Sequence, residues 1–176
     1  MTCKHFGECG ACKIYELGYE SQLQSKKELN QKRFASFYQN DITVFKSLDE
    51  HYRARSEFKI WHDEDELYYA MNHQEKGRVV FIEECPQVNE HIGTLMPTLL
   101  QAIKEKDIGF KLFGTDFLSS SSGEIVVSLL YHRKLDEAWQ VLATEIANDL
   151  GIYIIGRSRK QKVVIGQDYV TETLAI

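Results

Sequence analysis

Four cysteines are the residues in this sequence whose types and spacing most clearly suit chemistry. Cys3, Cys9 and Cys12 lie within ten residues of one another, and Cys85 stands far along the chain, directly before a proline. Two residues between Cys9 and Cys12 allow both thiolates to face one centre from a tight loop. Four thiolates are a ligand set of structural zinc sites and of cubane iron–sulfur clusters. The spacing therefore predicts a metal centre that ties the N-terminal loop to the rest of the fold.

The arrangement of the cysteines favours a cluster over zinc. Structural zinc sites usually pair two Cys-x2-Cys knuckles, whereas this chain has one such pair, one lone cysteine and one remote Cys-Pro. A final ligand followed by proline recurs in cluster proteins. We therefore expect a 4Fe–4S cluster on Cys3, Cys9, Cys12 and Cys85, with zinc as the alternative. A buried, unligated thiol is a further interpretation for Cys85 alone.

Composition and charge limit the class of protein. The chain has 176 residues, 43% of them hydrophobic, and a net charge of −5 from 21 basic and 26 acidic residues. This length suits one domain with a small appendage, and an acidic chain can still bind nucleic acid through a local basic patch. No apolar run approaches the roughly 18 residues that span a bilayer, and the polar N-terminus has no signal-peptide core. We therefore expect a cytoplasmic protein with no membrane partner, in which clustered cysteines are metal ligands.

The elements that must position these residues follow from hydrophobic periodicity. We expect a cysteine-rich segment over residues 1–15 and an α+β domain over residues 16–176. The predicted helices cover residues 16–38, 87–106 and 135–150, the last capped by Gly151, and the predicted strands cover residues 42–46, 53–62, 67–71, 78–82, 110–118, 124–131, 152–157 and 161–165. The order from residue 78 to residue 157 is β-α-β-β-α-β. It predicts a ferredoxin-like antiparallel sheet with both helices on one face and with extra strands.

Basic residues gather at two places on this acidic chain. In the predicted strand over residues 53–62, Arg53, Arg55 and Lys59 share a face with Trp61. Cations for phosphates thus stand beside an aromatic ring that can stack on bases. The second group is the tip of the last hairpin, which carries Arg157, Arg159, Lys160 and Lys162. Together the two groups predict an RNA-binding surface, with a solvated turn as the alternative interpretation of the hairpin tip.

Two features of the sequence resemble a known family. The pattern Cys-x5-Cys-Gly-x-Cys with a remote Cys-Pro is similar to the 4Fe–4S motif of RNA uracil-C5 methyltransferases, although Ala11 stands where that motif has a second glycine. The central part of the chain resembles the bacterial tRNA branch of this family. That similarity is carried by HYRARSEFKIWHD at residues 51–63, KLF at 111–113, VSLLYHRKLD at 127–136 and IGR at 155–157. It extends from about residue 15 to the end of the chain.

This resemblance implies an activity that the chain does not carry alone. Enzymes of the family methylate C5 of a uridine with S-adenosylmethionine, and in the tRNA branch the target lies in the T-loop. Their catalytic cysteine, general base and cofactor site belong to a C-terminal domain, and the present sequence has no glycine-rich cofactor loop after a strand. We therefore expect no catalytic residue here and an inactive isolated chain. S-adenosylmethionine would bind only in the absent C-terminal methyltransferase domain.

The resemblance also implies RNA contacts and a substrate. Glu57 and Lys59 match positions that contact the T-loop, with lysine where arginine is usual, and Phe113 matches an aromatic wedge that stacks on bases. Pattern alone instead places Phe113 in the core of a strand. The expected partner is the T-arm of tRNA. Ribosomal RNA is the alternative, because the cysteine motif is typical of the rRNA branch.

Two other functions are compatible with the same residues. A zinc- or cluster-bearing interaction module would need the four cysteines but no RNA. The ferredoxin-like order suggests an electron-transfer protein, but such ferredoxins keep their cysteines close in sequence, and a fold does not fix a function. The RNA-recognition part of a methyltransferase accounts for the cysteines and the basic groups together. It is the function that the sequence predicts.

Overall fold

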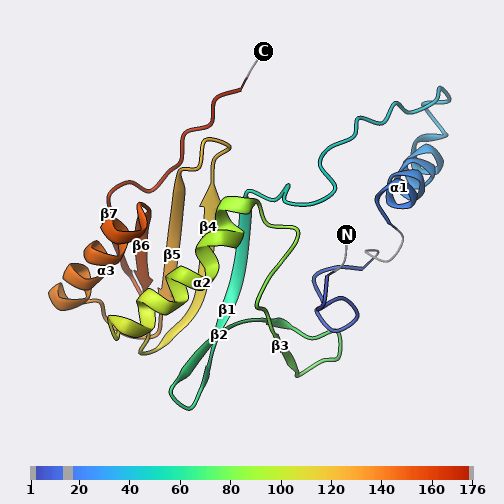
Figure 1. Cartoon of the computed structure of the whole chain (residues 1–176). Helices are drawn as coiled ribbons and strands as arrows, with labels where there is room; N and C mark the ends of the chain where they lie inside the picture. The colour runs from blue at the N-terminus through green and yellow to red at the C-terminus, as the bar shows by residue number, and fades with distance from the viewer. Residues whose placement is uncertain (1–2, 14–17, 175–176) are drawn as a thin grey trace.

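One sheet and three helices make up the part of the chain that the computed structural model describes, residues 3–13 and 18–174 (Figure 1). The helices are α1 (Gly18–Phe34), α2 (Glu90–Glu105) and α3 (Glu137–Leu150). The strands are β1 (Arg55–Asp63), β2 (Glu66–Asn72), β3 (Val79–Phe81), β4 (Leu112–Ser119), β5 (Ile125–Tyr131), β6 (Tyr153–Ser158) and β7 (Gln161–Ile165). The predicted boundary between residues 15 and 16 lies outside the described residues. No helix in the described ranges is long and apolar enough to cross a membrane.

The sheet is open and mixed, with the strand order β3-β2-β1-β4-β5-β6-β7. Neighbouring strands run antiparallel, except that β5 and β6 run parallel because α3 carries the chain back between them. Figure 1 shows α2 and α3 on the same face of the sheet. The opposite face has no helix over it in the described part of the chain, so its side chains are open to a partner.

The predicted α+β class and the β-α-β-β-α-β order along the chain are confirmed, but the ferredoxin-like antiparallel sheet is wrong. In a ferredoxin-like sheet the first strand of the unit lies in the middle, whereas β3 is an edge strand paired with β2. The reason is that β5 and β6 pair directly with each other, which leaves no place between them for β3, and β3 pairs with β2 instead. The hydrophobic periodicity of a strand does not predict which other strand it pairs with.

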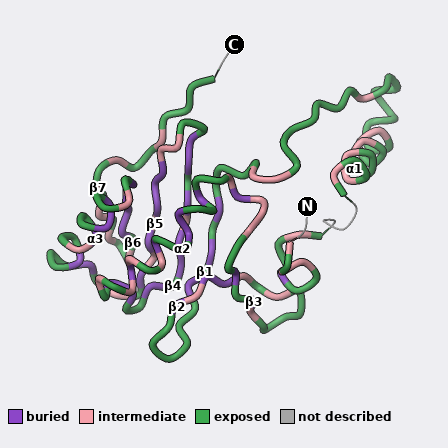
Figure 2. The backbone as a smooth tube through the Cα atoms, in the orientation of Figure 1, coloured by how far each residue is buried: buried purple, intermediate pink, exposed green. Residues whose placement is uncertain are grey.

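Alternation along the strands builds the core beneath the helices. Phe58, Phe117 and Leu129 belong to the same buried cluster as Leu99 of α2 and Trp139 of α3. Figure 2 shows this buried backbone concentrated in the sheet and the facing sides of α2 and α3. Burial of apolar area contributes about 25 cal/mol per Å², so these elements form the stable frame of the molecule.

Both core helices have ends encoded by their sequence. The Asn89 side chain accepts a hydrogen bond from Ile92 N at the start of α2, and Asp136 Oδ1 accepts one from Trp139 N at the start of α3. The last helix ends at Gly151, whose φ of 64° lies in the left-handed region. The predicted cap at Gly151 is therefore confirmed.

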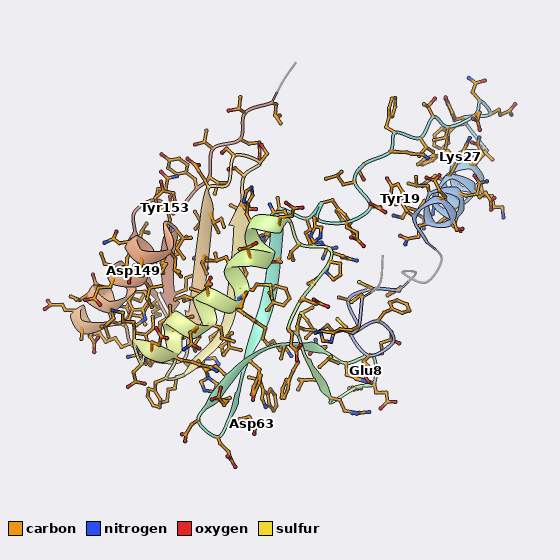
Figure 3. All side chains as sticks on the ribbon, in the orientation of Figure 1. Glu8, Tyr19, Lys27, Asp63, Asp149 and Tyr153 are labelled. Carbon is orange, nitrogen blue, oxygen red and sulfur yellow. The ribbon has the colours of Figure 1, made fainter. Side chains whose placement is uncertain are left out.

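The first helix and the segment that follows form an arm, residues 18–48, which stands apart from the sheet. Figure 3 shows Tyr19 and Lys27 on this arm, and α1 buries no residue. The Tyr19 hydroxyl donates to Ser47 O at 2.9 Å, and Lys27 pairs with Asp41 at 2.7 Å. The predicted strand over 42–46 is wrong, since these residues have no regular structure. A strand needs a neighbour with free backbone groups, and the backbone of a helix is already paired.

Candidate metal centre and RNA-binding face

The cysteine loop, residues 3–13, is bound to the sheet through its backbone. Gly10 N donates a hydrogen bond to Asn72 O at 2.9 Å, and Gln74 N donates one to Glu8 O at 2.7 Å. A side chain at Gly10 would bring its Cβ to 3.2 Å from Asn72 O, so this close approach favours glycine. The loop therefore lies against the end of β2 and, through it, belongs to the body of the molecule (Figure 1).

Cys85 reaches the cysteine loop from the segment between β3 and α2. Val88 N donates to Cys85 O at 3.2 Å, and Arg53 N donates to Gln87 O at 2.8 Å, which fixes this segment against the chain that enters β1. The four cysteines predicted as ligands line one cavity: Cys3, Cys9, Cys12 and Cys85. The structure thus brings together residues that are more than seventy positions apart in the sequence.

The thiols of the cavity act on one another electrostatically. Burial raises the pKa of the Cys9 thiol, and the neighbouring Cys85 and Cys3 raise it further. Burial is also the main cause that raises the pKa of Cys12, followed by the other three thiols, while Arg53 acts in the opposite direction. Thiols with a raised pKa keep their protons at neutral pH, and a bound metal would replace those protons.

Four thiols are a donor set of both structural zinc sites and cubane clusters. Among residues 3–13 and 18–174, no group of three His, Cys, Asp or Glu side chains converges so that it could hold one metal ion. A zinc ion needs its thiolates within about 2.3 Å of one point. Four thiolates that hold a cubane bind different iron atoms and stand farther apart. The cavity is also lined by two residues with a buried, unpartnered polar atom, His5 Nε2 and Ser56 Oγ.

An exposed aromatic pair lies at a β-bulge on the sheet. The register of β4 and β5 shifts between Leu112 and Gly114, and Phe113 occupies the shift. The Phe113 side chain is 40% exposed, and its ring stacks on His132 with centroids 4.0 Å apart and an interplanar angle of 13°. The core position that pattern alone suggested for Phe113 is therefore wrong. Sequence reasoning omitted His132 from the site, although the basic run at residues 132–134 was an available signal.

Cations surround this aromatic pair. A surface hollow of about 510 Å³ is lined by Phe113, Leu130, Tyr131, His132, Arg133, Lys134, Arg157, Ser158 and Arg159. The Nε atom of Arg133 is buried and has no hydrogen-bond partner. Buried polar atoms without a partner are uncommon in folded proteins. The hollow therefore combines a flat stacking surface, positive charge and an unused donor.

A row of facing residues crosses the helix-free side of the sheet beside the bulge. The strand register pairs Lys59 with Gly114, Gly114 with Leu130, Leu130 with Arg157, and Arg157 with Lys162. Paired residues share one face of a sheet, and Phe58 and Leu129, which neighbour Lys59 and Leu130 along their strands, are buried on the other face. Three of the predicted cations thus share a surface, although Lys162 also pairs with Asp168.

The remaining predicted contacts are more dispersed. Arg55 and Glu57 form an ion pair with each other on β1. Arg53 lines the cysteine cavity instead of joining Lys59 on the open face. Lys160 lies in the exposed turn between β6 and β7 with a φ of 59°. Alternation predicted that Arg53, Arg55 and Lys59 share one face of a strand. The strand begins at Arg55, so the alternation does not apply to Arg53.

Comparison with known proteins gives the family of the chain. The family model described as tRNA (Uracil-5-)-methyltransferase matches residues 18–176. A tRNA/tmRNA (uracil-C(5))-methyltransferase of Sulfurimonas denitrificans is 62% identical over 177 residues, covering 100% of this chain and 48% of the relative. A protein of the same name in Acinetobacter baylyi is 44% identical over 163 residues, covering 90% of this chain and 45% of the relative. The chain spans about half the length of these curated relatives.

A solved structure has the same fold. The Pyrococcus abyssi tRNA (uracil-54, C5)-methyltransferase, in complex with S-adenosyl-L-homocysteine, matches with a TM-score of 0.59 and 18% identity, over 96% of this chain and 40% of that one. At this identity the likeness concerns the fold alone. The family match begins at residue 18, so the cysteine loop lies outside it. Because the match covers nearly all of the chain that follows this loop, the chain belongs to the tRNA (uracil-5-)-methyltransferase family.

Proposed function

We propose that this chain is the RNA-recognition part of an S-adenosylmethionine-dependent tRNA uracil-C5 methyltransferase that acts on the T-loop. The observation that carries the proposal is the Phe113–His132 stack beside a cation-lined hollow on the helix-free face. Unstacked bases of RNA loops bind to exposed aromatic rings, and phosphates bind to lysine and arginine. Membership of the family supplies the reaction, and the names of the relatives supply tRNA and tmRNA as substrates.

We propose a division of labour between two halves, which the length of the relatives supports. This chain covers 48% of the Sulfurimonas protein, and in our proposal the other half binds S-adenosylmethionine and carries the catalytic residues. The residues described here would open and hold the RNA. A base displaced from its loop would stack on Phe113, and Lys59, Arg157 and Lys162 would hold the adjoining phosphates.

Binding of a T-arm hairpin RNA tests the RNA role. Stacking of a base on an aromatic side chain contributes about 1–3 kcal/mol, so we expect Phe113→Ala to weaken binding by about 5- to 150-fold. The matched control is Phe45→Ala, because Phe45 is an exposed phenylalanine on the arm. Affinity should also fall steeply with salt. Absence of binding at low salt would instead favour an interaction module without an RNA role, and preference for a ribosomal RNA stem-loop would favour an rRNA substrate.

We further propose that the cysteine cavity holds a structural 4Fe–4S cluster. The support is that Cys3, Cys9, Cys12 and Cys85, a ligand set of cubane clusters, line one cavity. Such a cluster would tie the cysteine loop to the segment between β3 and α2. The Arg53 guanidinium, which favours the thiolate form of Cys12, would offset part of the negative charge of the cluster.

Metal analysis of protein purified without oxygen tests the cluster. We expect about four irons and four sulfides per chain and a broad visible absorption band. Cys85→Ser should lower the iron content and the thermal stability together, because metal that joins distant segments contributes to folding. One zinc per chain without colour would replace the cluster by a structural zinc site. Unchanged iron in Cys85→Ser would exclude Cys85 as a ligand.

A further inference from the structure

Two unpaired polar atoms belong to side chains that line the cysteine cavity. His5 Nε2 and Ser56 Oγ are both buried and have no hydrogen-bond partner, and both residues line the cavity together with the four thiols. Ser56 as a whole is only 8% exposed. Leaving a buried donor unpaired costs about 1–3 kcal/mol. A serine hydroxyl donates, and an imidazole donates in the tautomer with its proton on Nε2, so a ligand with acceptor atoms would satisfy both.

The positions of both side chains are fixed by the backbone. His5 O accepts a hydrogen bond from Cys9 N at 2.9 Å, so the backbone at His5 is fixed in the turn that leads to Cys9. Ser56 belongs to β1, where it pairs with Phe117 of β4 and faces the helix-covered side of the sheet. One donor therefore comes from the cysteine loop and the other from the rigid sheet.

A third donor near these two already contacts sulfur. Gln87 Nε2 donates a hydrogen bond to Cys12 Sγ at 2.9 Å, and Gln87 lines the same cavity. Two carboxylates, Glu57 and Glu84, also line the cavity, but both side chains are exposed and lie beside Arg55 and Lys4. The thiol sulfur atoms are the further acceptors that the cavity supplies.

We propose that His5, Ser56 and Gln87 form a hydrogen-bond shell that donates to the sulfur atoms of the bound cluster and sets its reduction potential. The proposal rests on the cluster proposed above. Hydrogen bonds to sulfur withdraw electron density from the cluster and stabilise its more negative, reduced state. Loss of a donor therefore moves the reduction potential to more negative values and strengthens the Fe–S bonds. The three residues are positioning residues for the cofactor and do not ligate iron.

The experiment compares single variants of the anaerobically purified chain. Ser56→Ala removes one oxygen atom, His5→Leu removes the imidazole donor, and His5→Gln restores a side-chain N–H. The matched controls are Ser128→Ala and His91→Leu, neither of which lines the cavity. Iron and sulfide per chain are measured first, and then the reduction potential, the Fe–S stretching frequencies and the half-life of the visible band in air.

We expect full iron content in Ser56→Ala together with a more negative potential and higher Fe–S frequencies. The reduction potential should shift by about 59 mV, which for a one-electron couple is a tenfold change in the ratio of oxidised to reduced cluster. His5→Leu should shift the reduction potential and the Fe–S frequencies in the same directions. His5→Gln should give values between those of His5→Leu and the unmodified chain. If His5→Leu fails to load iron, Ser56→Ala decides the question, because it leaves the cysteine loop intact.

Two outcomes would overturn the inference, and they are distinguishable. A loaded cluster whose potential and frequencies are the same in Ser56→Ala, His5→Leu and the controls would show that the two atoms pair with buried water, and the cluster itself would stand. An unmodified chain that binds no iron would refute the cluster, and the donor shell with it.

Discussion

The cysteine loop and the arm are neighbours in sequence, but they relate to the sheet in opposite ways. The loop is joined to β2 by backbone hydrogen bonds and faces a cavity that it shares with β1 and Cys85. The arm buries nothing along α1, and its side chains bind one another, as Lys46 binds Glu20. The family match includes the arm and excludes the loop. A segment can therefore lie within the family match without packing on the sheet, as the arm does, or pack on the sheet outside that match, as the loop does.

The arm also exposes apolar side chains that the sheet would bury. Phe37, Phe45 and Leu48 are 75%, 88% and 69% exposed. Single exposed apolar side chains are common on protein surfaces, so these exposures show that the sheet does not bury them. The loop presents the reverse case, with apolar residues turned inward to its cavity. We therefore expect substitutions and metal removal to affect the arm differently from the loop and the core of the molecule.

The largest difference is expected from a matched pair of leucine substitutions. Leu99 in α2 is 0% exposed and Leu29 in α1 is 50% exposed. Leu99→Ala should reduce the free energy of unfolding by about 2–5 kcal/mol, since it leaves a cavity in the core. Leu29→Ala should change it by less than about 0.5 kcal/mol. Urea unfolding followed by circular dichroism measures both, and equal losses would mean that the arm packs on the body.

A smaller and more local effect is expected when the metal is removed. Chelation of iron should speed amide hydrogen exchange at Cys9 and Gly10 by more than about tenfold, because in our proposal a cluster holds the loop on the sheet. The amides of α1 should exchange at the same rate before and after chelation. Mass spectrometry of peptic fragments resolves the two segments. Unchanged exchange in the loop would show that its backbone hydrogen bonds suffice without metal.

The smallest effect is expected within the arm. The Tyr19 hydroxyl donates to Ser47 O and accepts from Ser47 N at 2.8 Å. Tyr19→Phe removes both hydrogen bonds, each with a net value of about 0.5–1.5 kcal/mol. We expect several-fold faster proteolysis within residues 40–48 and no change in global unfolding. Tyr38→Phe on the same arm is the control, and a fall in the global melting temperature would contradict the independence of the arm.

Local chemistry explains which parts of the fold were predictable. Strict alternation located β1, and Gly151 located the end of α3, because each signal acts within a few residues. The sheet order was mispredicted because the direct pairing of β5 with β6, and of β1 with β4, depends on contacts between segments distant in sequence. Residues 42–46 were predicted as a strand, but the element beside them is a helix, whose backbone groups are already paired.

The candidate site also has a part that the sequence predicted and a part that it did not. The sequence by itself predicted that the N-terminal loop and Cys85 come together, since metal chemistry restricts ligand types and spacing, and it located the basic residues of the last hairpin. Only the tertiary structure decided that Arg53 lies at the cysteine cavity, that a bulge turns Phe113 outward onto His132, and that His5 Nε2 and Ser56 Oγ are left unpaired beside the thiols. The physical reason is range: residue type and periodicity act over a few positions, whereas a shared cavity depends on strand pairing between distant segments.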